Sequence, residues 1–202
     1  MTMKGKVALV TGAGSGIGKA AALMLAEGGT RVAVLSRTAA EVEKTRDEIV
    51  AAGGEAIAIS ADISLEDDMK RATDTLIGAW GRLDILVANA GINGVWAPID
   101  DLTPEEWDKT IAVNLRGTYL TLHHAVPHMK KAGGGSIVVV GSINGTRTFT
   151  TAGATAYAAT KAAQLAMVQQ LALELGKARI RINAVCPGLI ETNIPDNMVK
   201  RN

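Results

Sequence analysis

Short apolar runs alternate along the chain with longer stretches in which apolar residues recur every three or four positions. The short runs are rich in valine and isoleucine and almost continuously apolar, which is typical of strands buried on both faces. They predict strands at residues 6–10, 31–35, 55–60, 83–89, 136–142 and 181–185. The longer stretches have helical periodicity and predict helices at 17–27, 39–52, 64–80, 103–131 and 154–175. This alternation indicates a parallel sheet covered by helices on both faces.

Two of these helices begin with capping signals. Ser64 is followed three residues later by Asp67, which predicts an N-cap at Ser64. Thr103 is followed by Pro104 and then Glu106, which is a capping box with proline at the first helical position. Both signals place helix starts between predicted strands, as a βαβ arrangement requires.

No linker, repeat or low-complexity segment interrupts the alternation. The chain has 202 residues, enough for one well-buried domain, so we expect residues 1–202 to form a single doubly wound α/β domain of Rossmann type. We expect this one domain to carry both dinucleotide binding and catalysis.

Charge and composition exclude several function classes. The formal net charge is +1, from 21 basic and 20 acidic side chains, so there is no electrostatic case for nucleic acid or an anionic membrane. No apolar run approaches the ~20 residues of a membrane span, and the N-terminal apolar run is too short for a signal peptide. Cys186, the single cysteine, cannot form an internal disulfide, which suits a reducing cytoplasm.

A glycine-rich loop, TGAGSGIG at 11–18, directly follows the first predicted strand and opens the first helix. Its glycines fit the spacing G-x-x-x-G-x-G through Gly12, Gly16 and Gly18. Nucleotides bind at this position in such sheets, because a tight turn brings backbone N–H groups and a helix N-terminus to a pyrophosphate. The alternative interpretation is an ordinary strand-to-helix turn.

Tyr157 precedes Lys161 by one helical turn in ATAYAATKAA, so the two side chains share a helix face. A free tyrosine has a pKa near ~10, and lowering it by about three units takes roughly 4 kcal/mol of extra phenolate stabilisation. An ammonium one turn away in a partly dry cleft supplies much of this. We therefore expect Lys161 to lower the pKa of Tyr157 and make it a general acid–base; the alternative is an exposed surface pair.

Three motifs together resemble one family. T-G-x-x-x-G-x-G after the first strand, ANAG at 88–91 and Y-x-x-x-K at 157–161 are similar in order and position to the classical short-chain dehydrogenases/reductases. The likeness is in register from about residue 4 to residue 192. It implies hydride transfer between a nicotinamide cofactor and a carbonyl/secondary alcohol pair.

The resemblance also implies a catalytic set of four residues. Ser142 ends the fifth predicted strand and would hydrogen-bond the substrate carbonyl or hydroxyl. Tyr157 would be the proton donor, and Lys161 would bind the nicotinamide ribose hydroxyls and tune Tyr157. Asn114, in IAVNLRG, matches the asparagine that in the family holds a water within a proton relay to the lysine.

Binding residues are implied in the same way. The cofactor set comprises Gly12, Ser15, Gly16, Ile17, Gly18, Arg37, Asp62, Ile63, Asn89, Ala90, Gly91, Tyr157, Lys161, Pro187, Gly188, Ile190 and Thr192. The substrate set comprises Ser142, Tyr157, Trp96 and Phe149. Two departures from the family are Ala88, where a further asparagine is common, and a slightly long segment between Ser142 and Tyr157.

The end of the second strand distinguishes NADP from NAD. NAD enzymes usually place a carboxylate there for the ribose hydroxyls, whereas this chain has Ser36-Arg37, with Glu41 as the next acid. A guanidinium suits a 2′-phosphate, which it can bind bidentately. We therefore expect NADP(H) rather than NAD(H); the alternative is a solvated Arg37 and an enzyme that uses NAD.

Other functions remain open on the sequence. We expect the chain to lack the family's C-terminal lid and last strand, which would suit a non-catalytic dinucleotide-binding sensor or regulator. An isomerase or dehydratase could use the same Tyr–Lys pair on a nucleotide sugar. A serine hydrolase is excluded, because Gly141-Ser142 does not fit a G-x-S-x-G elbow and no histidine follows it. The resemblance implies a homotetramer, with a dimer as the fallback.

Histidine and cysteine give no further site. His124 and His128 have a possible ligand spacing, but no cysteine or carboxylate cluster joins them and Pro127 should disturb the helix between them, so no metal is expected. Cys186 is expected to be a small buried apolar residue rather than a nucleophile.

Overall fold

A six-stranded parallel sheet forms the centre of the molecule. The computed structural model describes residues 3–147, 152–190 and 199–200. The strand order is β3-β2-β1-β4-β6-β7, with every neighbouring pair parallel. The strands are β1 Val7–Thr11, β2 Arg31–Ser36, β3 Ala56–Ser60, β4 Ile85–Ala88, β6 Gly135–Val140 and β7 Ile180–Val185. The predicted doubly wound Rossmann-type α/β fold is confirmed.

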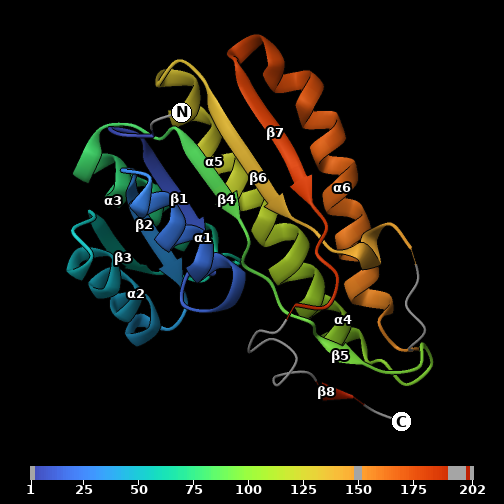
Figure 1. The fold of residues 1–202 in the computed structure, drawn as a ribbon. Helices are drawn as coiled ribbons and strands as arrows, with labels where there is room; N and C mark the ends of the chain where they lie inside the picture. Colours follow the sequence, from blue (N-terminus) through green and yellow to red (C-terminus); the bar gives the residue numbers. More distant parts are fainter. Residues whose placement is uncertain (1–2, 148–151, 191–198, 201–202) are drawn as a thin grey trace.

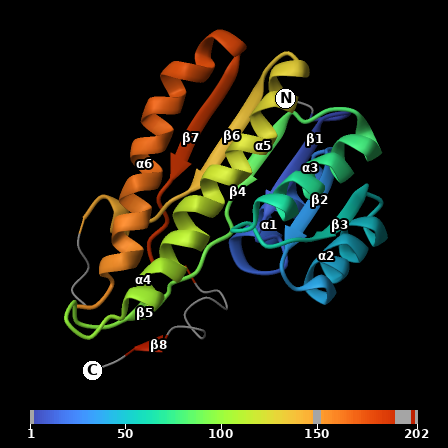
Figure 2. The ribbon, with the colours of Figure 1, turned by 180° about the vertical axis from the view of Figure 1, so that it is seen from behind.

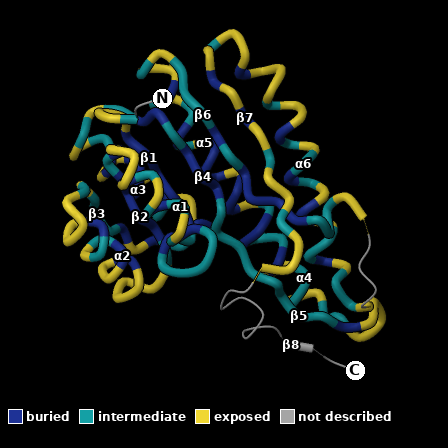
Figure 3. The backbone as a smooth tube through the Cα atoms, in the orientation of Figure 1, coloured by how far each residue is buried: buried dark blue, intermediate teal, exposed yellow. Residues whose placement is uncertain are grey.

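Helices cover both faces of this sheet. They are α1 Gly16–Glu27, α2 Ala39–Ala51, α3 Glu66–Trp80, α4 Pro104–Ile111, α5 Gly117–Lys131 and α6 Thr155–Leu175. Figure 1 shows α1 and α2 on one face, and Figure 2, from behind, shows α3, α5 and α6 on the other. Two buried apolar clusters correspond to the two faces, and Figure 3 shows the strands between them as the most buried part of the chain.

Three local features differ from the prediction. Helix α3 begins at Glu66 with Leu65 as its N-cap, so the predicted cap at Ser64 is wrong. The Ser64 hydroxyl instead donates a 2.7 Å hydrogen bond to Asp62 Oδ1 and therefore faces away from the helix. Two short strands, β5 Val95–Trp96 and β8 Val199–Lys200, pair with each other and were not predicted.

The helix predicted at 103–131 begins as expected but is not uniform. Thr103 accepts from the Glu106 N–H while Glu106 accepts from the Thr103 N–H, so the capping box is confirmed. A π-helical turn, η1 Ala112–Arg116, then separates α4 from α5. Pro127 lies inside α5 without ending it.

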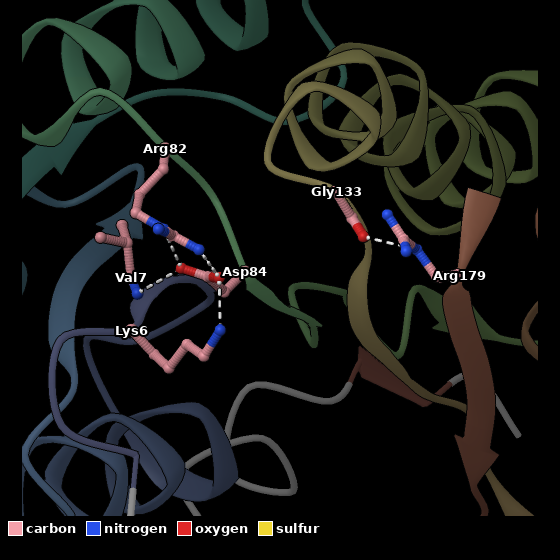
Figure 4. A network of polar contacts seen from close by, with 6 residues as sticks. All are labelled: Lys6, Val7, Arg82, Asp84, Gly133 and Arg179. Carbon is pink, nitrogen blue, oxygen red and sulfur yellow. Dashed lines mark hydrogen bonds and ion pairs between the residues drawn. The ribbon is translucent and has the colours of Figure 1, made fainter.

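Asp84 ties together the amino-terminal edge of the sheet. It precedes β4 and is buried, and its carboxylate accepts hydrogen bonds from Arg82, Lys6 and the Val7 N–H (Figure 4). Burial alone would raise the pKa of Asp84, but these donors together lower it. A separate bond from Arg179 Nε to the Gly133 carbonyl joins the start of β7 to the turn before β6 at this same edge. The cavities described below lie at the opposite edge, where the parallel strands end.

Candidate active site

The carboxyl ends of the parallel strands bring most of the predicted site residues around one cavity of about 290 Å³. Ser142, Tyr157 and Lys161 line it together with the glycine loop. The other predicted residues on its wall are Ile17, Asn89, Ala90, Gly91, Trp96, Pro187, Gly188 and Ile190. Ligand pockets typically measure about 300–1,000 Å³.

A second cavity of about 660 Å³ shares the wall formed by Gly12, Ser15 and Ala90. It is lined by Arg37, Asp62 and Ile63, which belong to the predicted cofactor-binding set. The two cavities therefore border the same stretch of glycine loop, as an extended dinucleotide requires. Gly18 and Asn114 line neither cavity, and Thr192 and Phe149 lie outside the described residues.

The glycine loop approaches β4 so closely that side chains are excluded. Gly12 has φ +66°, and a Cβ there would lie 2.9 Å from Ala90 Cα. A Cβ on Gly18 would lie 2.5 Å from Asn89 Nδ2 and would also meet the Gly12 carbonyl. Gly12 therefore keeps the loop against the cavity wall, and Gly18 lets α1 pack against it.

The start of α1 is suited to a phosphate group. Ser15 is the N-cap but makes no side-chain capping hydrogen bond, and no acidic residue occupies the first turn. The first N–H groups of the helix are thus not capped by Ser15 and carry the positive end of the helix dipole. Both Ser15 and Gly16 line the cavity, so these donors can bind a pyrophosphate.

Thr11 and Asn89 hold the loop to β4. The Thr11 hydroxyl accepts from the Asn89 N–H at 3.0 Å and from the Ala90 N–H at 3.1 Å. Asn89 Nδ2 donates in return to the carbonyls of Thr11 and Gly12, at 3.0 and 3.3 Å. Thr11 was missed as a functional residue, although it stands first in TGAGSGIG and could have been found there. This exchange accounts for a structural role of Asn89.

Tyr157, Lys161 and Ser142 meet at the end of β6. Lys161 Nζ lies 5.6 Å from the centroid of the Tyr157 ring and donates a 2.9 Å hydrogen bond to the Val140 carbonyl. The Ser142 hydroxyl accepts from the Asn144 N–H at 3.2 Å and is hydrogen-bonded to Tyr157. A carbonyl oxygen in the cavity would thus meet two hydroxyl groups side by side.

Burial dominates the protonation of this pair. It raises the pKa of Tyr157, and the hydrogen bond with Ser142 offsets only part of that rise. It also lowers the pKa of Lys161 to about 8, although the nearby Cys186 acts in the opposite direction. The prediction that Lys161 lowers the pKa of Tyr157 is wrong for this structure, because desolvation of the phenolate outweighs any help from an ammonium directed at Val140. Tyr157 is therefore protonated at neutral pH, as a proton donor must be.

Asn114 is fully buried in the π-helical turn and supports the loop after β4. Its Oδ1 accepts from the Ile92 N–H at 2.8 Å, and its Nδ2 donates to the Ile92 carbonyl at 2.8 Å and to Thr160 Oγ1 at 3.2 Å. A Cβ on Gly91 would lie 3.1 Å from Asn114 Oδ1 and 3.8 Å from Lys161 Nζ. Gly91 therefore lies close to both residues.

Arg37 pairs with Asp62 at the far end of the second cavity. Arg37 Nη1 lies 3.8 Å from Asp62 Oδ2, and the arginine side chain is more than half exposed. Glu41 also lines this cavity and lies against Gly14, where an added Cβ would be 2.6 Å from Glu41 Oε2. One guanidinium and two carboxylates thus line the second cavity.

Cys186 is exposed, so the prediction of a buried thiol is wrong. This residue follows the edge strand β7, where Val185 is exposed as well.

Among residues 3–147, 152–190 and 199–200, no three histidine, cysteine or acidic side chains are grouped as a metal site would need. Within the same residues, no helix has the length and apolar character needed to cross a membrane.

Comparison with known proteins places the chain in a family. The family model for short chain dehydrogenase matches residues 6–202. An uncharacterized oxidoreductase of Thermotoga maritima is 42% identical over 95% of this chain and 74% of its own length. Cyclohexanol dehydrogenase of an Acinetobacter species is 41% identical over 93% of this chain and 74% of its own.

A solved structure of a 3-ketoacyl-ACP reductase from Sinorhizobium meliloti is 67% identical, with a TM-score of 0.91. It is matched over 97% of this chain and 75% of that one. The chain belongs to the short-chain dehydrogenase/reductase family and is an oxidoreductase of that family.

Proposed function

We propose that the protein is an NADP(H)-dependent oxidoreductase that interconverts a ketone and a secondary alcohol. The observation that carries the proposal is that Ser142, Tyr157 and Lys161 line one cavity together with the glycine loop. A sensor would need the loop but not the hydroxyl pair beside it.

The residues present fit a nicotinamide dinucleotide. Gly12 and Gly18 leave no room for a Cβ where the loop meets β4, and the α1 N-terminus offers donors for a pyrophosphate. When bound, the reduced nicotinamide supplies the hydride. Lys161 lines the same cavity and would donate to the ribose hydroxyls.

Ser142 and Tyr157 then handle the carbonyl oxygen. In the reducing direction Ser142 donates a hydrogen bond that polarises the carbonyl while the carbon gains the hydride. Tyr157 transfers its phenolic proton to the developing alkoxide, and the resulting phenolate is stabilised by Lys161 before it regains a proton. In the oxidising direction the same groups act in reverse.

Arg37 is the basis for preferring NADP(H). An ion pair of 3.8 Å between partly exposed groups is weak, so the guanidinium can turn to a 2′-phosphate. Related structures of 37% identity carry NADH in a 3-ketoacyl-(acyl-carrier-protein) reductase from Brucella melitensis and NADP in a metagenomic oxidoreductase. The proposed preference for NADP(H) over NAD(H) therefore rests on this chain's own residues.

The proposed substrate class is a ketone or the corresponding secondary alcohol, because cyclohexanol dehydrogenase and the 3-ketoacyl-ACP reductase are both named for such a pair. We also propose a homotetramer in the cytoplasm. Tyr119 on α5 and Leu173 on α6 are 49% and 79% exposed, and such apolar side chains on long helices suit contact with a second copy. A dimer is the fallback.

Calorimetric titration with NADPH and NADH tests the cofactor, and an assay with cyclohexanone and a 3-ketoacyl thioester tests the chemistry. We expect tighter NADPH binding, and about a tenfold loss of it in Arg37→Gln with NADH binding unchanged. Arg46→Gln, at a position lining neither cavity, is the matched control. Tyr157→Phe should lower turnover at least ~100-fold with cofactor affinity intact; full activity in that variant would overturn the catalytic assignment.

A further inference from the structure

The π-helical turn at Asn114 makes its backbone carbonyl an acceptor for side chains. Asn114 lies in η1, between α4 and α5, and π turns interrupt the regular helical ladder, frequently at functional sites. The Asn114 carbonyl accepts from Gln164 Nε2 at 2.7 Å and from Thr118 Oγ1 at 2.7 Å. Two donors use both lone pairs of that oxygen.

Gln164 makes this contact from the neighbouring helix. It lies on α6 three residues after Lys161, so both side chains point to the buried face of that helix. Gln164 is 1% exposed, and its Nε2 also donates to Thr118 Oγ1 at 2.8 Å. Because Nε2 must face a carbonyl that can only accept, the orientation of the amide is determined.

The other end of the Gln164 amide is unfavourable for stability. Its Oε1 is buried with no hydrogen-bond partner among the described residues. An unsatisfied buried acceptor destabilises the fold, because it has lost its hydrogen bonds to water without gaining a replacement. Methionine has a similar length and would fill the position without that cost, so packing does not account for a glutamine here.

Asn114 transmits the contact to the cavity wall. Its side chain holds the Ile92 backbone through a pair of 2.8 Å hydrogen bonds, and a Cβ added at Gly91 would lie 3.1 Å from Asn114 Oδ1 and 3.8 Å from Lys161 Nζ. Gly91 and Ile92 both line the cavity. A displacement of the Asn114 backbone would therefore displace the wall beside Lys161.

We propose that Gln164 is a positioning residue for proton transfer, and this rests on the proposed function. It holds the Asn114 carbonyl, and through Asn114 it fixes Gly91 and Ile92 against Lys161. Lys161 stabilises the phenolate that proton transfer leaves on Tyr157, so a shift of this wall would change the position of Lys161 relative to Tyr157.

The test is Gln164→Met, which keeps the length and removes both the donor and the unsatisfied acceptor. In the protein without cofactor, we expect an unchanged or higher thermal midpoint and an Ile92 amide that exchanges with D₂O about 5-fold faster. In the assay with NADPH and cyclohexanone or the 3-ketoacyl thioester, we expect kcat to fall about tenfold with KM within about twofold. The ratio of kcat in H₂O to kcat in D₂O should rise, because proton transfer at Tyr157 becomes slower.

Two further variants separate positioning from packing. Gln169→Met, at an exposed position on the same helix, should behave as the wild type in every measurement. Gln164→Glu restores a donor only when its carboxyl is protonated, so its kcat should recover toward wild type as the pH is lowered.

The proposal is overturned if Gln164→Met shows wild-type exchange at Ile92 together with wild-type kcat and isotope ratio. It is also overturned if kcat falls only as the thermal midpoint falls and KM rises, since that pattern is simple loss of structure. If the wild type turns over neither ketone, the proposed function has failed, and the exchange rate of the Ile92 amide still decides whether Gln164 positions Asn114.

Discussion

The ammonium of Lys161 donates its 2.9 Å hydrogen bond to the backbone carbonyl of Val140, the last residue of β6. This bond ties α6 to the sheet at the edge where the cavity lies. It also explains the protonation of the site, because a buried ammonium whose polar contact is a neutral carbonyl has little to offset its loss of hydration. Without cofactor, Lys161 is thus held in place at a cost to folding, ready to face ribose hydroxyls.

The stability of the protein should therefore depend on alkaline pH through Lys161. Its pKa falls from 10.5 in the unfolded chain to about 8 in the folded one, so between these values the unfolded chain binds more protons. The free energy of unfolding should rise by about 2–3 kcal/mol from pH 7 to pH 10 on this account. Lys161→Met removes the dependence.

Urea unfolding of wild type and Lys161→Met at both pH values measures this contribution. The comparison uses the pH difference within each protein, because methionine also removes the hydrogen bond to Val140 at every pH. Lys177→Met, at an exposed position, should keep the wild-type dependence. Equal pH dependence in wild type and Lys161→Met would contradict the lowered pKa.

Removal of the Ser142 hydroxyl should raise the pKa of Tyr157 further. Burial already raises it, and the hydrogen bond with Ser142 is what opposes that rise. The chain has only two tyrosines, so Tyr119→Phe leaves Tyr157 as the sole titrating phenol. In that background, the ultraviolet absorbance of tyrosinate should appear at higher pH in Ser142→Ala than with Ser142 present.

Thr146→Ala is the matched control for that titration, because Thr146 is exposed and directly follows the short 3₁₀ helix η2 Ile143–Gly145, whose N-cap is Ser142. It should leave the absorbance curve unchanged. A curve for Ser142→Ala that moves to lower pH would mean that the serine does not stabilise the phenolate.

The sequence predicted the sheet and most of the cavity because both depend on local patterns. Almost continuous apolar strands identified the buried sheet, and the glycine spacing identified the loop at its carboxyl edge. The parallel arrangement then placed Ser142 and Tyr157 together without further information. The capping box at Thr103 was equally local and was found correctly.

What the sequence missed depends on tertiary surroundings. The sign of the shift at Tyr157 follows from burial, which spacing along a helix does not report. The exposure of Cys186 depends on what covers the edge strand β7. The π-helical turn at Asn114 adds one residue to a turn within a pattern that otherwise reads as a single helix. The two-residue strands β5 and β8 are too short for any periodicity.

Asp84 should stabilise the fold at neutral pH and lose that effect in acid. Asp84→Asn removes a buried charge and leaves Arg82 and Lys6 without their shared partner, which we expect to cost about 2–4 kcal/mol at pH 7. Because the folded-state pKa is lowered, the stabilisation is present above the unfolded value of 3.8 and disappears as the pH falls through the folded value. The gap between wild type and variant should thus narrow from pH 7 to pH 3.

Urea unfolding at these two pH values checks the prediction, with Asp74→Asn as the control. Asp74 pairs with Lys70 on the exposed face of α3, and such pairs contribute about 0–1 kcal/mol. A loss in Asp84→Asn no larger than in Asp74→Asn would mean that the network of Figure 4 contributes little.

Gly18→Ala should impair cofactor binding more than it impairs folding. The new methyl group would lie 2.5 Å from Asn89 Nδ2 and against the Gly12 carbonyl, so α1 or the glycine loop must move. The movement displaces the α1 N-terminus from the pyrophosphate position, and we expect at least a ~10-fold loss of NADPH affinity by calorimetry.

Gly78→Ala is the matched control, since Gly78 lies within α3 and an added Cβ there meets nothing within 4 Å. Alanine should stabilise that helix by up to about 1 kcal/mol and leave NADPH binding unchanged. If Gly18→Ala bound NADPH as tightly as Gly78→Ala, the close contact of the loop with Asn89 would not be what shapes the site.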